Sequence, residues 1–296
     1  MPEQFTNLRG DLRRNEPLSK YTSWRVGGIA QYFYRPADKA DLATFMAQLT
    51  PAEPILWLGL GSNLLVRDGG FAGTVIATAG LLHDITVEKN TIHADVGVYC
   101  SKLAKKAAKS GLTGAAFLAG IPGTLGGALA MNAGAHGVET WSLISDVTTI
   151  DRQGQFKQRA AADFKVAYRE VKMPADEWFI SATLDLQPGD QESERVQIKE
   201  LLRKRNASQP TNQPCAGSVF RNPDNDFAGR LIEQQGLKGL SVGGAEVSEK
   251  HANFIVNTGT ATAADIETLI ELVQQKVEHA YGIRLQPEVH IIGEVS

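Results

Sequence analysis

The segment from Gly120 to Ala135 constrains the fold most, because it is rich in glycine without resembling a linker. Five of its sixteen residues are glycine and none is charged. A flexible surface linker is polar, whereas this segment predicts a buried loop with four apolar side chains: Ile121, Leu125, Leu129 and Met131. Glycines let a backbone approach a ligand closely, and successive free N–H groups can bind an anion such as a pyrophosphate. The alternative is a close-packed glycine turn without a ligand.

Length and composition indicate an ordinary globular protein of about two domains. The chain has 296 residues, of which 43% are hydrophobic and 21% charged, and its net charge is −3. This charge, without a long basic run, argues against nucleic acid or a membrane surface as the main partner. We find no signal peptide, no apolar run of membrane-spanning length, no Cys-x-x-Cys and no metal-ligand spacing of histidines. We therefore expect a cytoplasmic protein without a metal.

A second glycine segment, Gly59-Leu-Gly-Ser-Asn63, follows the apolar run Ile55–Leu58. It begins like a dinucleotide-binding fingerprint, but Leu64 stands where a Rossmann loop requires glycine, and strand and turn patterns follow instead of a helix. These features disfavour a Rossmann domain, and the absence of Gly-Lys-Ser or Gly-Lys-Thr excludes a Walker loop. Alone, the segment fits either a phosphate contact or a plain tight turn.

Periodicity predicts a mixture of hairpins and helices, which favours an α+β fold over a regular parallel α/β fold. Asp38 is the predicted N-cap of an early helix, and Thr262 with Asp265 resembles a capping box for the last one. We expect strands over 30–35, 55–58, 84–88, 91–96, 177–186 and 253–256, and a hairpin of 143–151 with 155–157. The sequence Gln187-Pro-Gly-Asp precedes a charged helical start and is the best candidate for a domain boundary.

Taken in order, the glycine segments and three further motifs resemble the UDP-N-acetylenolpyruvoylglucosamine reductase family. The resemblance covers roughly Ser19 to Gly293, and five motifs in this order are far more specific than any one of them. The motifs are Gly59-Leu-Gly-Ser-Asn63, Ile121-Pro-Gly-Thr-Leu-Gly-Gly127 with Met131-Asn-Ala-Gly134, Tyr168-Arg169, Gly217-Ser-Val-Phe-Arg-Asn-Pro223 and Pro287-Glu288-Val289.

The resemblance implies a two-lobed α+β FAD-binding domain of the vanillyl-alcohol oxidase type over 1–190 and a smaller α+β substrate-binding domain over 191–296. The last strand is expected to return to the active site. The resemblance also implies non-covalent FAD, NADPH as hydride donor, UDP-N-acetylglucosamine-enolpyruvate as substrate in peptidoglycan synthesis, and no obligate protein partner. The implied FAD contacts are Gly59, Gly61, Ser62, Asn63, Ile121, Pro122, Gly123, Gly126, Gly127 and Gly134.

The implied reaction requires a cation and a proton donor. Hydride addition to the enolpyruvyl double bond leaves an enolate that must be stabilised and protonated. By resemblance, Ser218 takes the proton-donor position, and Arg169 and Glu288 take the other two active-site positions. The planar guanidinium of Arg169 suits the substrate carboxylate. Glu288 would donate a proton if protonated, or orient Ser218 or a water if ionised, and the sequence leaves this open.

Substrate contacts are implied for Tyr168, Asn222 and Arg221. Arg205, Arg221 and Lys238 are candidates for the substrate diphosphate, although each alone fits a solvated surface cation. Outside the family pattern, Arg169, Ser218 and Glu288 would equally fit a surface charge, a turn hydroxyl and an edge-strand carboxylate.

Two departures from the family pattern stand out. Val171 occupies a position where the family commonly has serine, and no inserted tyrosine loop fits between Arg169 and Trp178. The chain therefore resembles the compact branch of the family, for which we expect a more open substrate cleft.

Two other functions remain open. One is another flavin-dependent dehydrogenase or oxidase of the same superfamily; many of these tether flavin through His or Cys, which neither glycine segment contains. The other is a binding module that has lost turnover, against which the joint presence of Ser218, Arg169 and Glu288 argues.

Overall fold

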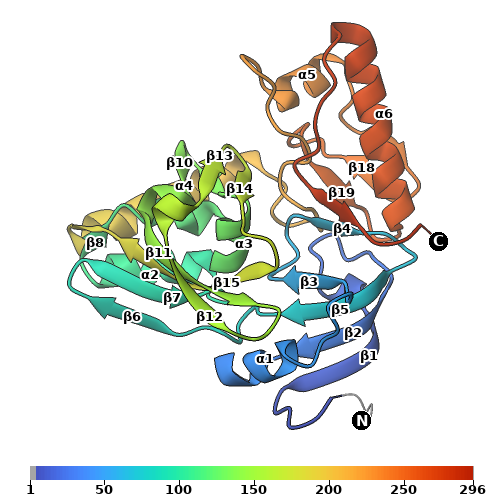
Figure 1. The fold of residues 1–296 in the computed structure, drawn as a ribbon. Coiled ribbons are helices and arrows are strands. Elements are labelled where there is room, and N and C mark those ends of the chain that lie inside the picture. Colours follow the sequence, from blue (N-terminus) through green and yellow to red (C-terminus); the bar gives the residue numbers. More distant parts are fainter. Residues whose placement is uncertain (1–4, 296) are drawn as a thin grey trace. The chain divides into compact units, whose positions relative to one another are not determined.

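The computed structural model describes residues 5–295, which form two compact units (Figure 1). Unit 1 contains the chain up to Arg14, Tyr32–Leu60 and Gly73–Arg203, and unit 2 contains Asn15–Gln31, Gly61–Ala72 and the chain from Lys204. Both units are therefore discontinuous in sequence. The division into units reflects how the chain packs and not where ligands bind. The assignment of 1–190 to FAD and 191–296 to substrate therefore stays a prediction.

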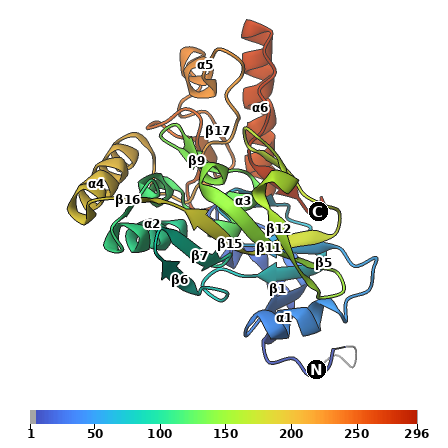
Figure 2. The same ribbon diagram turned by 60° about the vertical axis from the view of Figure 1, so that its left-hand side comes forward.

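The centre of unit 1 is a five-stranded antiparallel sheet in the order β12-β11-β15-β7-β6. Figure 2 shows β15 running between β7 and β11. The predicted strands at 84–88, 91–96 and 177–186 and the predicted hairpin are confirmed. The strands are β6 Ile85–Glu88, β7 Thr91–Asp95, β11 Ile144–Asp151, β12 Phe156–Ala160 and β15 Glu177–Asp185.

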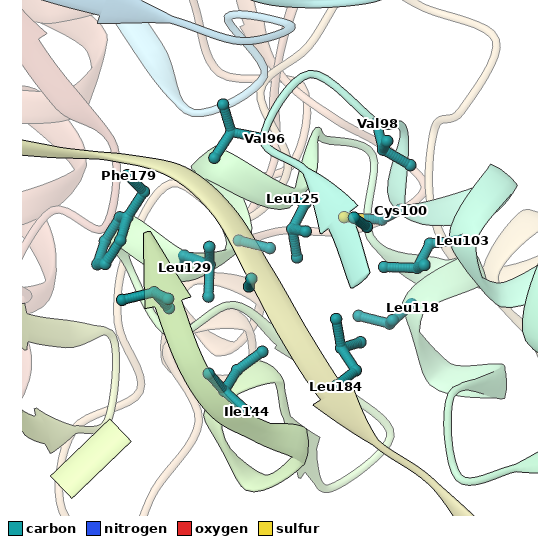
Figure 3. Close-up of a cluster of buried hydrophobic side chains, with 14 of the residues drawn as sticks. Val96, Val98, Cys100, Leu103, Leu118, Leu125, Leu129, Ile144, Phe179 and Leu184 are labelled. Carbon is teal, nitrogen blue, oxygen red and sulfur yellow. The ribbon is translucent and has the colours of Figure 1, made fainter. Parts of the chain in front are cut away.

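Short helical segments pack on this sheet: α2 Cys100–Lys109, a 3-10 helix at Ala116–Gly120 and α3 Leu125–Ala130. In Figure 3, Leu103, Leu118 and Leu129 from these segments gather with Ile144 and Leu184 of the sheet in one buried cluster. The prediction of a loop throughout 120–135 was wrong for α3. Leu125, Ala128 and Leu129 are buried at helical spacing, so tertiary packing overrides the low helix propensity of Gly126 and Gly127.

A second sheet has the order β1-β2-β5-β3, in which β3 and β5 are parallel. Its strands are β1 Asp11–Pro17, β2 Ile29–Arg35, β3 Ile55–Leu58 and β5 Phe71–Ala77. The predicted early helix is α1 Lys39–Met46, and the side chain of its N-cap Asp38 accepts a hydrogen bond from the Asp41 N–H, as expected. The charged helix α4 spans Gln191–Ser208. A small ladder pairs β8 Leu112–Thr113 with β16 Gln187–Pro188.

Unit 2 is built on the last helix, α6 Ala263–Tyr281, which contacts a three-stranded sheet of β17, β18 and β19 (Figure 1). The predicted capping box of Thr262 and Asp265 is confirmed, as is the end of the helix at Gly282, which has φ +68°. The other elements are β17 Ser241–Val242, β18 Ala245–Val247, β19 Ile255–Asn257, α5 Ala228–Gln234, and β4 Leu64–Val66, which pairs in parallel with β20 His290–Ile292. Within residues 5–295, no helix is both long enough and apolar enough to cross a membrane.

The start of β15 carries a buried carboxylate, Glu177, that is fully engaged by its neighbours. It accepts hydrogen bonds from Arg159 at 2.5 Å, Lys157 at 3.0 Å and the Thr149 hydroxyl at 2.9 Å. The Arg159 guanidinium contributes most to lowering the pKa of Glu177, from 4.5 to about 2. Between these two values the unfolded chain binds the proton that the folded chain does not, so the ionised carboxylate stabilises the fold above pH 4.5.

We predict that Glu177→Gln lowers the free energy of unfolding by about 2 kcal/mol at pH 7, after allowing for solvent screening of the cations. The difference from wild type should shrink as the pH falls from 4.5 toward 2, because both proteins then carry a neutral group there. Urea unfolding at pH 7, 5 and 3 measures this difference. Glu88→Gln, on an exposed strand residue, is the control, and an equal loss in both variants would contradict the prediction.

Candidate active site

The two glycine segments meet within unit 1. A Cβ atom on Gly59 would lie 2.5 Å from the Thr124 hydroxyl oxygen, so only glycine permits this approach. Gly59, Gly126 and Gly127 line one cavity of about 140 Å³, together with Thr124, Trp57 and Trp178. Three of the predicted FAD contacts are thus brought together.

Backbone hydrogen bonds fix the longer glycine segment to the chain before α2. The Leu125 N–H donates to Val98 O at 2.8 Å and the Gly126 N–H to Val96 O at 2.9 Å, while Gly123 O accepts from the Cys100 N–H at 3.0 Å. The expectation that the amides of this segment face a ligand is therefore wrong for Leu125 and Gly126. Because its N–H is already bonded, Gly126 can contribute to ligand binding only by letting a ligand approach the backbone closely.

The donor set around this cavity fits a dinucleotide cofactor. The Thr124 hydroxyl and the Trp57 indole nitrogen are buried, and neither has a hydrogen-bond partner within residues 5–295. Buried polar groups are rarely left unpaired, because that costs about 1–3 kcal/mol each. Oxygen and nitrogen acceptors of a nucleotide such as FAD would satisfy both groups. These two residues could not be identified from the sequence, because threonine and tryptophan are common types whose burial and hydrogen bonding are known only from the structure.

The second half of the shorter glycine segment, Gly61 to Asn63, belongs to unit 2. Gly61 has φ +60°, and a Cβ there would lie 2.1 Å from Tyr21 O, so the position requires glycine. The Asn63 side-chain amide donates to Glu288 O at 3.0 Å, and Asn63 O accepts from the His290 N–H at 3.0 Å. Ser62 lies half-buried between Gly61 and Asn63.

Ser218 and Glu288 lie on neighbouring segments of unit 2. The Glu288 N–H donates to Val219 O at 2.7 Å, and the Arg221 N–H donates to Gln286 O at 2.9 Å. Ser218 and Glu288 are both half-buried. These two hydrogen bonds therefore bring two of the three predicted catalytic residues onto adjoining segments of the chain. The last strand, β20, pairs with β4 beside Asn63, and its return to the active site stays a prediction.

Buried Asn253 holds the segment that follows Ser218. Its side chain accepts from the Phe220 N–H at 2.9 Å and donates to Phe220 O at 2.8 Å, and its backbone oxygen accepts from the Val219 N–H at 2.9 Å. The amide thus pairs with the Phe220 backbone as a neighbouring strand would. A polar residue inside Ala252-Asn-Phe-Ile-Val256 was the signal for this residue, and sequence analysis treated it only as part of a strand.

Arg169 occupies the turn of a hairpin between β13 Lys165–Ala167 and β14 Glu170–Lys172. Its φ is +56°, a conformation that costs a non-glycine residue free energy and is enriched at functional sites. The guanidinium donates to Asn132 O and Gly134 O, both at 3.4 Å, and lies 4.9 Å from the centre of the Tyr168 ring. The sequence predicted no strand here, because β13 and β14 are short and mostly exposed.

Buried Asn132 supports this hairpin. Its side-chain amide donates to the Glu139 carboxylate at 2.7 Å and to Ala167 O at 3.2 Å, and its side-chain oxygen accepts from the Trp141 N–H at 3.1 Å. Glu139 lies in the hairpin of β9 Gly134–Ala135 and β10 Val138–Glu139. One buried amide therefore connects the β9–β10 hairpin to the residue before Tyr168.

A second cavity of unit 1, of about 530 Å³, lies at this hairpin. Its lining includes Gly134, His136, Glu139, Tyr168 and Arg169. The predicted FAD contact Gly134 and the predicted substrate contact Tyr168 therefore share a cavity with Arg169. The guanidinium is the cation of this group that can attract an anionic substrate.

The remaining predicted residues are distributed more widely. Arg169 and Tyr168 belong to unit 1, whereas Asn222 and Arg221 belong to unit 2 with Ser218. The Asn222 side chain accepts from the Ala228 N–H at 3.1 Å. Of the candidate diphosphate contacts, Lys238 forms an ion pair with Glu233 and Arg205 donates to the Gln209 side chain.

In the longer glycine segment, the predicted contacts differ in exposure: Ile121 is buried, Pro122 is exposed and Gly123 is half-buried. No group of three or more His, Cys, Asp or Glu within the described chain is arranged to hold a metal ion.

Comparison with known proteins is consistent along the whole chain. Residues 30–158 match the FAD binding domain, and residues 209–292 match the C-terminal domain of UDP-N-acetylenolpyruvoylglucosamine reductase. The UDP-N-acetylenolpyruvoylglucosamine reductase of Alkalilimnicola ehrlichii is 56% identical over 97% of this chain and 96% of its own length. That of Legionella pneumophila is 56% identical over 98% of this chain and 95% of its own.

A solved structure agrees with these sequences. The crystal structure of the UDP-N-acetylenolpyruvylglucosamine reductase from Thermus caldophilus superposes with a TM-score of 0.83 at 32% identity, and the match covers 96% of this chain and 99% of that one. The α+β fold, with an FAD-binding domain and a smaller C-terminal domain, is thereby confirmed. The chain belongs to the UDP-N-acetylenolpyruvoylglucosamine reductase family.

Proposed function

We propose that this chain reduces the enolpyruvyl double bond of UDP-N-acetylglucosamine-enolpyruvate to give UDP-N-acetylmuramate, with NADPH as the hydride donor. The reaction is a step of peptidoglycan synthesis, and we place the protein in the cytoplasm with no obligate protein partner, nucleic acid or membrane. FAD supplies hydride transfer between donor and substrate. The residues proposed to hold FAD are those predicted from the two glycine segments, Gly134 included.

Arg169 is the proposed binding group for the substrate carboxylate. Hydride addition to the terminal carbon of the enolpyruvyl group moves negative charge toward that carboxylate, and a guanidinium stabilises it with two parallel hydrogen bonds. The backbone oxygens of Asn132 and Gly134 and the Tyr168 ring restrain the Arg169 side chain. This restraint reduces the ordering that binding must impose on a long side chain.

Ser218 is the proposed proton donor to the carbon that carries the carboxylate, and Glu288 is the group that can return a proton to it. The observation that carries this assignment is the 2.7 Å hydrogen bond from the Glu288 N–H to Val219 O. It keeps Glu288 on the segment beside the serine. Asn253 fixes Val219 and Phe220 from the other side.

We predict that Ser218→Ala leaves flavin reduction by NADPH intact and slows flavin reoxidation by the enolpyruvyl sugar by about 10²- to 10⁴-fold, the usual loss when a general acid is removed. Anaerobic stopped-flow absorbance of the flavin measures the two half-reactions separately. Ser241→Ala, on an exposed strand residue of the same unit, is the control.

Unchanged reoxidation in Ser218→Ala would remove Ser218 from the mechanism. In the wild-type chain, flavin that bleaches with NADPH but is not reoxidised by the sugar would indicate a different acceptor. A chain that cannot be loaded with FAD would refute the proposed function itself.

The positive φ of Arg169 allows its side chain to be removed without straining the backbone. Arg169→Gly removes the guanidinium but suits φ +56°, so we expect the free energy of unfolding to stay within about 1 kcal/mol of wild type. The kcat/KM for the enolpyruvyl sugar should fall at least about 100-fold, because the negative charge of the reacting group loses its partner. Urea unfolding and steady-state kinetics measure the two effects.

The matched control is Lys89→Gly, because Lys89 has φ +53° in the turn between β6 and β7. It makes the same backbone change on an exposed residue away from both cavities, and kcat/KM should be unchanged. A wild-type kcat/KM in Arg169→Gly would show that this arginine is a surface charge.

A further inference from the structure

Asn132 is a buried asparagine with a left-handed backbone conformation. It is 1% exposed and has φ +46°, a conformation that only glycine adopts without strain. Asparagine tolerates this conformation better than most residues but still loses free energy in it. Burying an amide adds a further cost unless its polar atoms are paired. Because glycine would carry neither cost, an asparagine at this position indicates a role for its side chain.

The side chain of Asn132 holds the chain just before Arg169. Its amide nitrogen donates to Ala167 O at 3.2 Å and to the Glu139 carboxylate at 2.7 Å, which accounts for both of its N–H groups. Ala167 pairs with Glu170 across the β13–β14 hairpin, so Arg169 lies in a turn of two residues. The bond to Ala167 O therefore fixes one side of this turn.

The backbone of the same residue contacts the other end of Arg169. Asn132 O accepts from the guanidinium at 3.4 Å, as does Gly134 O. A Cβ atom on Gly134 would lie 2.7 Å from Val138 O and 3.3 Å from the Arg169 Nη1 atom. The guanidinium therefore lies against the backbone of residues 132–134, in a space that only glycine leaves open.

We propose that Asn132 is a positioning residue for Arg169, because it holds both ends of that arginine. Its side chain fixes the turn that carries the Arg169 backbone, and its backbone oxygen accepts from the guanidinium where this lines the cavity of about 530 Å³. The inference rests on the proposed function for the role of Arg169 in binding the substrate carboxylate. Misplacing a binding group by about 1 Å can cost about 100-fold in rate, so a residue that touches no substrate controls kcat/KM.

Two other bonds of Asn132 serve the β9–β10 hairpin and the segment after it, and they would by themselves give the residue a purely structural role. They join its side chain to the Glu139 carboxylate and to the Trp141 N–H, the latter at 3.1 Å. A test of positioning therefore has to separate the bond to Ala167 O from these two.

Asn132→Gly removes the side chain, suits φ +46° and keeps the backbone oxygen. In steady-state kinetics of the FAD-loaded protein, kcat/KM for the enolpyruvyl sugar should fall about 10- to 100-fold. In the Arg169→Gly background the same substitution should change kcat/KM less than about twofold, because the group that Asn132 positions is already absent. Asn7→Gly, on an exposed residue with φ +58°, is the control and should leave kcat/KM unchanged.

A reversed pair separates positioning from support of the β9–β10 hairpin. Asn132→Asp alone places a second carboxylate beside Glu139 and should lower the urea midpoint. Adding Glu139→Gln supplies a donor and restores that hydrogen bond in the opposite direction, so the midpoint should return toward wild type. The bond to Ala167 O stays lost, because a carboxylate has no donor. The kcat/KM of the double variant should therefore remain at least about tenfold below that of Glu139→Gln alone.

Three results would overturn the proposal: unchanged kcat/KM in Asn132→Gly, additive losses from Asn132→Gly and Arg169→Gly, and a double variant that matches Glu139→Gln in kcat/KM. Additive losses would show that Asn132 acts through the fold and not through the arginine. Wild-type protein that does not reduce the enolpyruvyl sugar would instead refute the proposed function. Unchanged kcat/KM in Arg169→Gly would refute the role of that arginine, so these failures are distinguishable.

Discussion

The site in unit 1 depends on the backbone hydrogen bonds that join the longer glycine segment to Val96–Cys100. A glycine-rich chain loses much conformational entropy when it is ordered, and these bonds fix the segment without using any side chain. They also set the start of α3, since the Leu125 and Gly126 amides are both engaged. Leu125 and Leu129 then anchor the helix in the core shown in Figure 3. Gly126 and Gly127 of α3 consequently line one cavity, and Gly134, beyond the helix in β9, lines another.

Local sequence patterns were sufficient to predict a residue's structural role wherever that role depends on its neighbours in sequence. Asp38 and the pair Thr262 and Asp265 were predicted as caps because capping bonds span only three residues. The strands of the central sheet were predicted because apolar runs and alternation are local signals. The short helix α3 was missed for the opposite reason. Its sequence contains two glycines and resembles a loop, and only burial against the sheet makes it helical.

The candidate site could be predicted only as a set of motifs, because its geometry comes from contacts far apart in sequence. The Asn63 side chain reaches Glu288 O across 225 residues, and Asn253 pairs with Phe220 across 33. Asparagine is a common polar residue, so neither position stands out in the sequence. Thr124 and Trp57 become informative only when their unpaired atoms are known to be buried. The family resemblance identified Arg169, Ser218 and Glu288, but not the residues that hold them in place.

Asn63 connects the predicted cofactor-binding residues of unit 2 to the predicted catalytic residue Glu288. Its backbone oxygen accepts from the His290 N–H and its side chain donates to Glu288 O, so both ends of one residue are used to fix the last strand. The same residue closes the shorter glycine segment, in which Gly61 is required by φ +60° and by the carbonyl of Tyr21. A substitution at Asn63 would remove the side-chain bond to Glu288 O but leave the backbone bond to His290 in place. The FAD-binding role predicted for the glycine segment and the catalytic role predicted for Glu288 therefore share one structural support.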